Sequence, residues 1–357
     1  MKKTLFAALA LAFVASCSNE EVVEMAQKEA IGFDNAFVDN ATRSIDPSYS
    51  NSKLFANFAV YGFVDNATLF DGTTVTGSAL NGEWTYEGKQ YWIAGAKYNF
   101  SAVAPATGWT KTNASKDGVT LSFTNTNGKS DILFAKSAEI EGAASGNPTV
   151  AFTFKHILSK VKFSFKNSYN ATGATIRVKN IKITNAHEKG TVALGATTTT
   201  NDDGTKTTNI TTNWSNQTTT TENYALNFGN AATASETAEE NFGFEAANGA
   251  NVKESYNELL LIPGAVTNGY TVTFTVDLLM NGTLVKSYLH TATANFTPVA
   301  GYAYNINTEI NAENIDPENE QEPIEFTVTT INDWDYNHTG YNPGVDATVN
   351  TTPATGN

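Results

Sequence analysis

The sequence contains a single cysteine and only two arginines, and charged residues fill just 16% of its 357 positions. With Cys17 as the sole cysteine, the chain has neither an internal disulfide nor a cysteine-based metal cluster. Acidic residues outnumber basic ones, so the formal net charge is −14 at pH 7. Nucleic acids and anionic membranes are bound through clustered lysine and arginine, and we therefore expect neither as a partner.

Long apolar runs and helical periodicity are also lacking. Beyond the N-terminal leader, no segment is apolar over the roughly 20 residues that a membrane-spanning helix needs, and none repeats apolar residues every 3.6 positions. Aromatic residues nevertheless reach 11%, and Thr, Asn and Gly are abundant. Because β-branched and aromatic side chains fit a pleated, half-buried surface, this balance is typical of a secreted β protein.

No catalytic motif stands out. The four histidines are not spaced at i, i+2 or i, i+4, and none has a cysteine nearby, so we expect no metal, no cofactor and no enzyme activity. These histidines are His156, His187, His290 and His338. We interpret His156, which follows an apolar run, as a packed residue at a domain junction. A glycosidase stays open as an alternative, since two carboxylates could meet across a cleft, but the acidic pairs lie in polar segments.

Residues 1–16 resemble the signal peptide of a bacterial lipoprotein. Lys2 and Lys3 form a positive start, and the apolar run that follows is too short to span a bilayer. It ends in Val-Ala-Ser-Cys, which is similar to a lipobox, so we expect Cys17 to carry a lipid anchor. The alternative is a plain secretory signal with a chance cysteine. The Ser-Asn-Glu-Glu run after Cys17 resembles an outer-membrane sorting signal, which predicts a lipidated precursor in the cell outer membrane.

Arg43 follows a strand-like run, residues 31–38, in a stretch of small polar residues that ends at Pro47. Such an exposed tip is where proteolysis concentrates. Cleavage behind Arg43 would make Ser44 the new N-terminus and would release residues 17–43 as a propeptide. The alternative is that Arg43 is an ordinary surface charge.

Strand-like runs recur along the rest of the chain, separated by Gly, Asn, Asp and Pro. The run 154–165 is interpreted as the end of one domain and the first strand of the next. We therefore expect an all-β chain of two tandem β-sandwich domains, at 44–157 and 158–310. The Thr- and Asn-rich residues 191–223 are expected to form a long loop or a solvated edge hairpin. Asn281-Gly282 predicts a tight hairpin between two alternating runs.

An aromatic group lies early in the first domain. Residues 83–86 and 90–93 flank Glu-Gly-Lys, which predicts a hairpin with a glycine-containing turn. Its aromatic residues are Trp84, Tyr86, Tyr91 and Trp92. They could form a platform for stacking sugars, but we favour a hairpin that buries two of them in the core.

The C-terminal part alternates again after a polar break. Residues 311–334 hold an Asn- and Glu-rich linker followed by a strand-like segment in which Ile324, Phe326 and Val328 share one face. The segment ends near Trp334, and residues 335–357 are expected to form a flexible tail. Near the N-terminus, Ile31, Phe33 and Phe37 likewise lie at odd positions and are expected to face one side of a strand. Both segments therefore offer an apolar row together with backbone hydrogen-bonding groups.

These motifs, in this order, resemble the fimbrillins, the pilins of type V pili. The likeness covers nearly the whole chain and rests on the lipobox, Ile31-Gly32-Phe33, Thr42-Arg43, the aromatic group through Pro105, the run 154–163, Leu259–Pro263, Gly301–Ile306 and Ile331-Asn332-Asp333-Trp334. The resemblance implies two transthyretin-like (Ig-like) β-sandwiches with a C-terminal extension.

The resemblance also implies a route of assembly. An Arg-specific surface protease cuts the lipidated precursor behind Arg43, and the strand that carries Ile31, Phe33 and Phe37 leaves. The segment with Ile324, Phe326, Val328 and Trp334 is then donated by a neighbouring subunit, which builds an extracellular fimbrium of other fimbrial subunits.

Two alternatives remain open from the sequence. Residues 324–334 could be the last strand of their own domain instead of a donated strand. The polar residues that follow Trp334 depart from the pattern of a stalk subunit, and a tip or accessory subunit accepts a strand without donating one. In that case the protein is an anchored surface lipoprotein or tip adhesin that binds a host protein or glycan.

Overall fold

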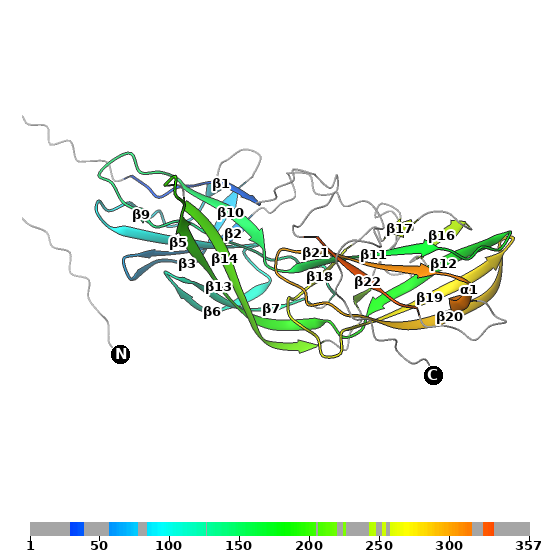
Figure 1. The fold of residues 1–357 in the computed structure, drawn as a ribbon. Coiled ribbons are helices and arrows are strands. Elements are labelled where there is room, and N and C mark those ends of the chain that lie inside the picture. Colours follow the sequence, from blue (N-terminus) through cyan, green and yellow to red (C-terminus); the bar gives the residue numbers. More distant parts are fainter. Residues whose placement is uncertain are drawn as a thin grey trace, which may run out of the picture.

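The computed structural model describes residues 29–38, 57–77, 84–125, 127–204, 206–219, 224–225, 243–247, 252–254, 258–315 and 324–331. Strands dominate this part of the chain, and its one helix is a single turn, α1 (Ala312–Ile315). The predicted all-β class is confirmed. Figure 1 shows an elongated molecule with one group of sheets towards each end.

The first sheet is built from eight of the described strands: β1 (Phe33–Val38), β2 (Asn57–Val64), β3 (Ala67–Gly77), β4 (Trp84–Thr85), β5 (Lys97–Ala104), β8 (Leu133–Lys136), β9 (Ile140–Glu141) and β10 (Val150–His156). They run in the order β1-β10-β8-β5-β2-β3-β4, and β9 also pairs with β5. Both faces of this sheet are covered. In β2, Phe58 and Val60 enter one apolar cluster, while Tyr61 and Phe63 enter another.

The sheet curls until its two ends meet. The N–H of Ile31 donates to the carbonyl oxygen of Gln90 at 2.8 Å, and the N–H of Trp92 donates to that of Glu29 at 3.0 Å. The segment that leads into β1 therefore joins β10 on one side and the chain just after β4 on the other. The curled sheet encloses an aromatic core, which includes Phe33, Phe58, Phe70, Trp84, Trp92, Tyr98, Phe100, Phe152 and Phe154.

A second sheet covers the other face of the first. Its strands are β6 (Trp109–Ser115), β7 (Gly118–Thr124), β13 (His187–Thr200) and β14 (Lys206–Thr219), in the order β14-β13-β7-β6. Strand β13 pairs with β7, so that Val192 lies opposite Leu121. Residues expected in a loop or edge hairpin thus form a hairpin, at least to Thr219. This hairpin lies after the predicted boundary at 157/158, yet it pairs with β7 and completes the first domain's sandwich.

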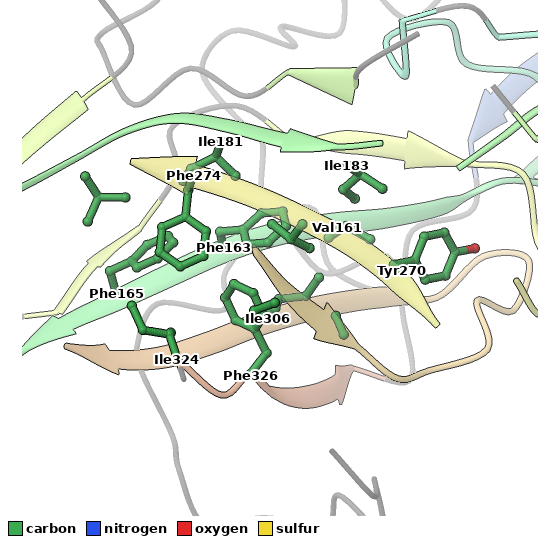
Figure 2. Packing of buried hydrophobic residues seen from close by; sticks show 14 of the residues in the cluster. Val161, Phe163, Phe165, Ile181, Ile183, Tyr270, Phe274, Ile306, Ile324 and Phe326 are labelled. Carbon is green, nitrogen blue, oxygen red and sulfur yellow. The ribbon is translucent and has the colours of Figure 1, made fainter. Parts of the chain in front are cut away.

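Two further sheets face each other in the second half. One contains β11 (Ser159–Asn167), β17 (Val252–Glu254), β18 (Leu259–Leu261), β21 (Ala303–Ile310) and β22 (Thr327–Ile331). The other contains β12 (Ala174–Ile183), β15 (Tyr224–Ala225), β16 (Gly243–Ala247), β19 (Tyr270–Met280) and β20 (Thr283–Ala294). Their inner faces interdigitate in one apolar core (Figure 2). The tight turn at Asn281-Gly282 joins β19 to β20, as predicted, with φ values of 48° and 79°.

One predicted hairpin is wrong. The two arms at residues 83–86 and 90–93 do not pair with each other: β4 pairs with β3, and Tyr91 forms a bridge with Ala30. The first arm pairs instead with the strand that precedes it in the sequence, and only the second arm pairs with a residue distant in sequence. Trp84 and Trp92 are still buried, at 7% exposure each. Two residues of the aromatic group therefore lie in the core, as predicted.

The two halves are joined by packing as well as by the chain. Ile157 and Leu158 lie in a cluster shared with β7, β13 and the residues around β18. At this junction the side chain of His156 is largely buried, and its Nδ1 lies 2.7 Å from Oδ2 of Asp131. The prediction of a packed junction residue is confirmed. Within the described residues, no helix is long and apolar enough to cross a bilayer.

Candidate functional site

The segment 29–38 is the closing strand of the curled sheet. Its backbone is bonded on two sides where it begins: towards residues 90–92, as described above, and towards β10, where the N–H of Val150 donates to the carbonyl oxygen of Gly32 at 2.8 Å. The hydroxyl of Tyr86 adds a bond to the carbonyl oxygen of Ile31 at 2.8 Å. From Phe33 onward, β1 runs parallel to β10. Removal of this segment would leave unpaired backbone groups on both flanks of a slot.

Phe33 is held in an aromatic cage. Its ring stacks on Phe152 with centroids 5.9 Å apart, and it makes edge contacts with Phe58, Phe70, Tyr86 and Phe100. Phe33 and Ile31 are 3% and 1% exposed. The slot that this segment fills is therefore deeply apolar, and an empty slot would place aromatic surface in water.

The register of β1 shifts between Asp34 and Phe37. Phe33 pairs with Val150, whereas Phe37 pairs with Thr153, which is exposed. The strand therefore does not alternate uniformly from Ile31 to Phe37, as the odd positions alone had indicated. Only the backbone pairing of Phe37 belongs to the described structure, so its place in an apolar row remains a prediction.

A polar clamp secures the start of the segment. Oε2 of Glu29 accepts hydrogen bonds from the backbone N–H of Asn147 at 2.8 Å and from its side-chain amide at 2.9 Å. These bonds hold the pKa of Glu29 below its ordinary value of 4.5. No sequence motif pointed to Glu29, Asn147 or Tyr86 as partners of this strand, because the three segments meet only when the sheet curls.

The second candidate segment, residues 324–331, packs within its own half of the chain. Ile324, Phe326 and Val328 are all buried, as their alternation predicted. Figure 2 shows Ile324 and Phe326 directed into the core between the two sheets. The ring of Phe326 lies 5.9 Å from that of Phe163 and 5.7 Å from that of Phe274, centroid to centroid.

Strand β22 occupies the edge of its sheet. It pairs antiparallel with β21, with Val328 opposite Ile306, and it is the last strand in the order β17-β11-β21-β22. Hydrogen bonds from the hydroxyl of Thr308 to the carbonyl oxygen of Glu325 (2.6 Å) and from the amide of Asn307 to that of Thr327 (3.4 Å) secure the segment. In the part of the chain that the structure describes, β22 therefore has a strand partner on one side only.

The two segments carry the same apolar spacing. Ile31-Gly32-Phe33 and Ile324-Glu325-Phe326 both read Ile-x-Phe, and in both the Ile and the Phe are buried while lying two residues apart. Each Phe also packs against several other aromatic rings. A slot shaped for the first segment thus presents the side-chain sizes, at the right spacing, for the second.

The other predicted site residues lie outside the described residues. These are Cys17, Arg43, Ser44 and Trp334. The second arginine, Arg177, is described: it lies in β12, opposite Glu245 of β16 on one side and Asp277 of β19 on the other. Because proteases act on extended, accessible backbone, a residue paired on both sides within a sheet is protected from cleavage.

Three of the four histidines lie in the described residues, and His187 and His290 are buried. This part of the chain holds no group of three His, Cys, Asp or Glu side chains placed to bind a metal ion. Burial lowers the pKa of His290 to about 4, and its ring stacks on Phe274.

A fimbrillin-like family model matches residues 42–334, which is most of the chain. The chain belongs to the fimbrillin-like family. A comparison with curated proteins gives no match. The solved structures similar to this fimbrillin-like chain include a protein assigned to cell adhesion from Bacteroides uniformis, 18% identical, covering 87% of this chain and 99% of that one with a TM-score of 0.45.

Two other solved structures are similar to the fimbrillin-like chain. One is a protein from Bacteroides ovatus assigned to cell adhesion, with 14% identity, 86% and 98% coverage of the two chains and a TM-score of 0.44. The other is the fimbrial anchor protein Mfa2 of Porphyromonas gingivalis, with 10% identity, 85% and 98% coverage and a TM-score of 0.32.

Proposed function

We propose that this fimbrillin-like chain is a structural subunit of a surface fimbria that serves adhesion, assembled by strand exchange after cleavage behind Arg43. The observation that carries the proposal is the place of residues 29–33. They close the curled sheet of the first domain, and they bring Ile31 and Phe33 into its aromatic core. Removal of this one segment would leave a long apolar slot that another strand can fill.

In the precursor, the slot is filled by the chain's own β1, so the precursor cannot accept a strand from a neighbour. A lipid on Cys17 holds it at the outer membrane until an Arg-specific surface protease cuts behind Arg43. The cut separates residues 17–43 from the remainder, and β1 then belongs to a short peptide that can dissociate. The second arginine, Arg177, is paired on both sides within β12, so a protease of this specificity is not expected to cut there.

The donated strand is the segment with Ile324, Phe326 and Val328. In its own domain this segment already buries those side chains, so the apolar gain in the slot is offset by the loss at home. Backbone hydrogen bonds favour the donated position. Among the described residues, the edge strand β22 pairs on one side only, whereas the slot offers backbone partners on two sides. Each net hydrogen bond gained contributes about 0.5–1.5 kcal/mol to the stability of the complex.

Replacement of Arg43 tests the proposal. Arg43→Ala should keep residues 17–43 attached and should abolish polymers seen by electron microscopy and as ladders on SDS gels. Arg177→Ala is the matched control, since it removes the other arginine and should leave assembly intact. Normal polymers from Arg43→Ala would sink the cleavage mechanism.

A second function is favoured by a specific observation: β22 completes its own domain in this structure. A tip adhesin or permanently anchored surface lipoprotein would keep β22 at home and bind a host protein or glycan. The N-terminal residue of the mature surface protein separates the two functions. Ser44 supports strand exchange, and a lipidated Cys17 supports the anchored form.

A further inference from the structure

Exposed apolar side chains gather at the two ends of the molecule. Among the described residues, the large hydrophobic residues classed as exposed are Tyr91, Ile93, Leu284, Val285, Leu289 and Val299. The first two lie in the first domain, beside the segment that leads into β1, and the next three lie on β20 in the second domain. Only Val299 lies near the junction, where its carbonyl oxygen accepts a hydrogen bond from Ser159.

At the first end, the apolar pair flanks the start of β1. Tyr91 forms a bridge with Ala30, and Ile93 follows Trp92, whose N–H bonds to Glu29. Ile93 is 60% exposed, although it sits next to the aromatic core. Because β1 runs parallel to β10 towards the domain junction, its beginning marks the outer end of the first domain.

At the second end, the outer half of β20 is an exposed sheet edge. Residues 283–287 are exposed on both faces of the strand, and Leu289 is 75% exposed. Strand β20 is the last in the order β15-β12-β19-β20, so its outer backbone groups have no strand partner among the described residues. A bare edge with apolar side chains is a surface that proteins normally cover.

The donor segment is tethered to this same end. The N–H of Ser168 donates to the carbonyl oxygen of Ile310, and the N–H of Asn281 donates to that of Gly173, so one short loop joins the end of β21 to the turn before β20. Helix α1 follows β21 and ends at Ile315, and residues 316–323 separate it from Ile324. The nine steps along the chain from Ile315 to Ile324 span at most about 32 Å. A domain that accepts Ile324 must therefore lie close to the β20 end.

The direction in which the donated strand is inserted determines which end of the acceptor lies next to the β20 end of the donor. If Ile324 and Phe326 take the places of Ile31 and Phe33, the donor enters the slot where β1 begins, beside Tyr91. The tether then brings this outer end of the acceptor against the outer end of the donor. Insertion in the opposite direction would bring the tether to the domain junction of the acceptor instead.

We propose that, in this assembly, Leu284, Val285 and Leu289 of one copy pack against Tyr91 and Ile93 of the next copy. The occupant of the exposed β20 edge is thus a second copy of this chain, and the contact rests on the proposed strand exchange. It covers apolar surface at both ends and holds the two copies in one fixed orientation around the inserted strand.

Cysteine cross-linking tests the contact directly. The chain from Ser44 onward contains no cysteine, so introduced thiols are the only ones present. The double variant Ile93→Cys/Leu284→Cys is processed behind Arg43, allowed to assemble and treated with a short bismaleimide. A covalent ladder is expected. The matched pair Ile93→Cys/Val299→Cys carries equally exposed thiols and should give no ladder. Equal ladders from the two pairs, or polymers of the first pair without any ladder, would overturn the contact.

A charge variant gives the second measurement. Leu284→Asp/Leu289→Asp should shorten the polymers several-fold, because charges at a packed apolar joint must be desolvated, while Val299→Asp should leave their length unchanged. Unchanged length in the double variant counts against the contact. The two proposals fail differently: if strand exchange is wrong, the unaltered chain from Ser44 does not polymerise, and if only the contact is wrong, it polymerises and the variants match it.

Discussion

Phe33 stacks on Phe152 with 15° between the ring planes, although the two residues lie at opposite ends of the first domain's sequence. This pair ties the start of β1 to β10, and a truncation should reveal how strongly. Phe33→Ala should destabilise the precursor by about 3–5 kcal/mol, since it empties a buried aromatic site. Denaturant unfolding measures the change. Tyr91→Ala, at an exposed neighbour, should cost far less. Equal costs would mean that β1 is not part of the first domain's core.

Phe326 should have a double effect. In the precursor, Phe326→Ala should cost about 3–5 kcal/mol, because its ring packs between Phe163 and Phe274. After the proposed processing, the same variant should fail to polymerise, since the donated strand would lack the ring that takes the place of Phe33. Glu325→Ala, one residue away and exposed, should affect neither stability nor assembly. Full assembly of Phe326→Ala would show that another segment fills the slot.

His290 predicts a stability change in mildly acidic solution. Burial lowers its pKa from 6.5 to about 4. Between these two pH values, His290 is protonated in the unfolded chain and neutral in the folded chain. Stability should therefore fall as the pH drops from about 6.5 to 4, by on the order of 3 kcal/mol, and the contribution should level off below that. His290→Phe keeps the stack on Phe274 and removes the titration. Parallel stability curves for the two proteins between pH 7 and 4 would contradict the assignment.

Glu29 predicts a second change at lower pH and in the precursor alone. Its pKa is held below 4.5 by the N–H groups of Asn147, so its contribution is complete above about pH 4.5 and is lost as the pH falls through the lower folded value. Glu29→Gln should remove this pH-dependent part. The comparison requires unfolding curves of both precursors from pH 6 to 3. After cleavage behind Arg43, which removes residue 29, no such difference should remain.

Much of the chain's organisation followed from local patterns. Ile324, Phe326 and Val328 are buried on one face because alternation is a strong signal where one side of a strand meets a core. Asn281-Gly282 formed its hairpin because both residues tolerate positive φ, which the tight turn demands. His156 is packed at the junction for a similar reason, as it is the last residue of β10, whose alternate residues are buried.

The features that escaped prediction depend on long-range pairing. The arms at 83–86 and 90–93 have a good turn between them, yet β4 pairs with the preceding strand β3, and Tyr91 pairs with Ala30, which is distant in the sequence. The bulge between Asp34 and Phe37 has no glycine or proline to announce it. The hairpin of β13 and β14 is rich in Thr and Asn, and nothing in it indicates that Val192 would pair with Leu121 in the other half of the chain.

This crossing hairpin has a mechanical consequence. The 157/158 connection alone would allow the two halves to rotate relative to each other. Strands β13 and β14, however, belong to the first domain's sandwich, where a ladder of backbone hydrogen bonds joins β13 to β7. Bending between the two halves would have to break that ladder of hydrogen bonds and could not occur by rotation of a few backbone dihedral angles. The proposed filament of such units would behave as a chain of stiff rods that bends mainly at the joints between them, which suits an appendage that must stay extended in flowing liquid.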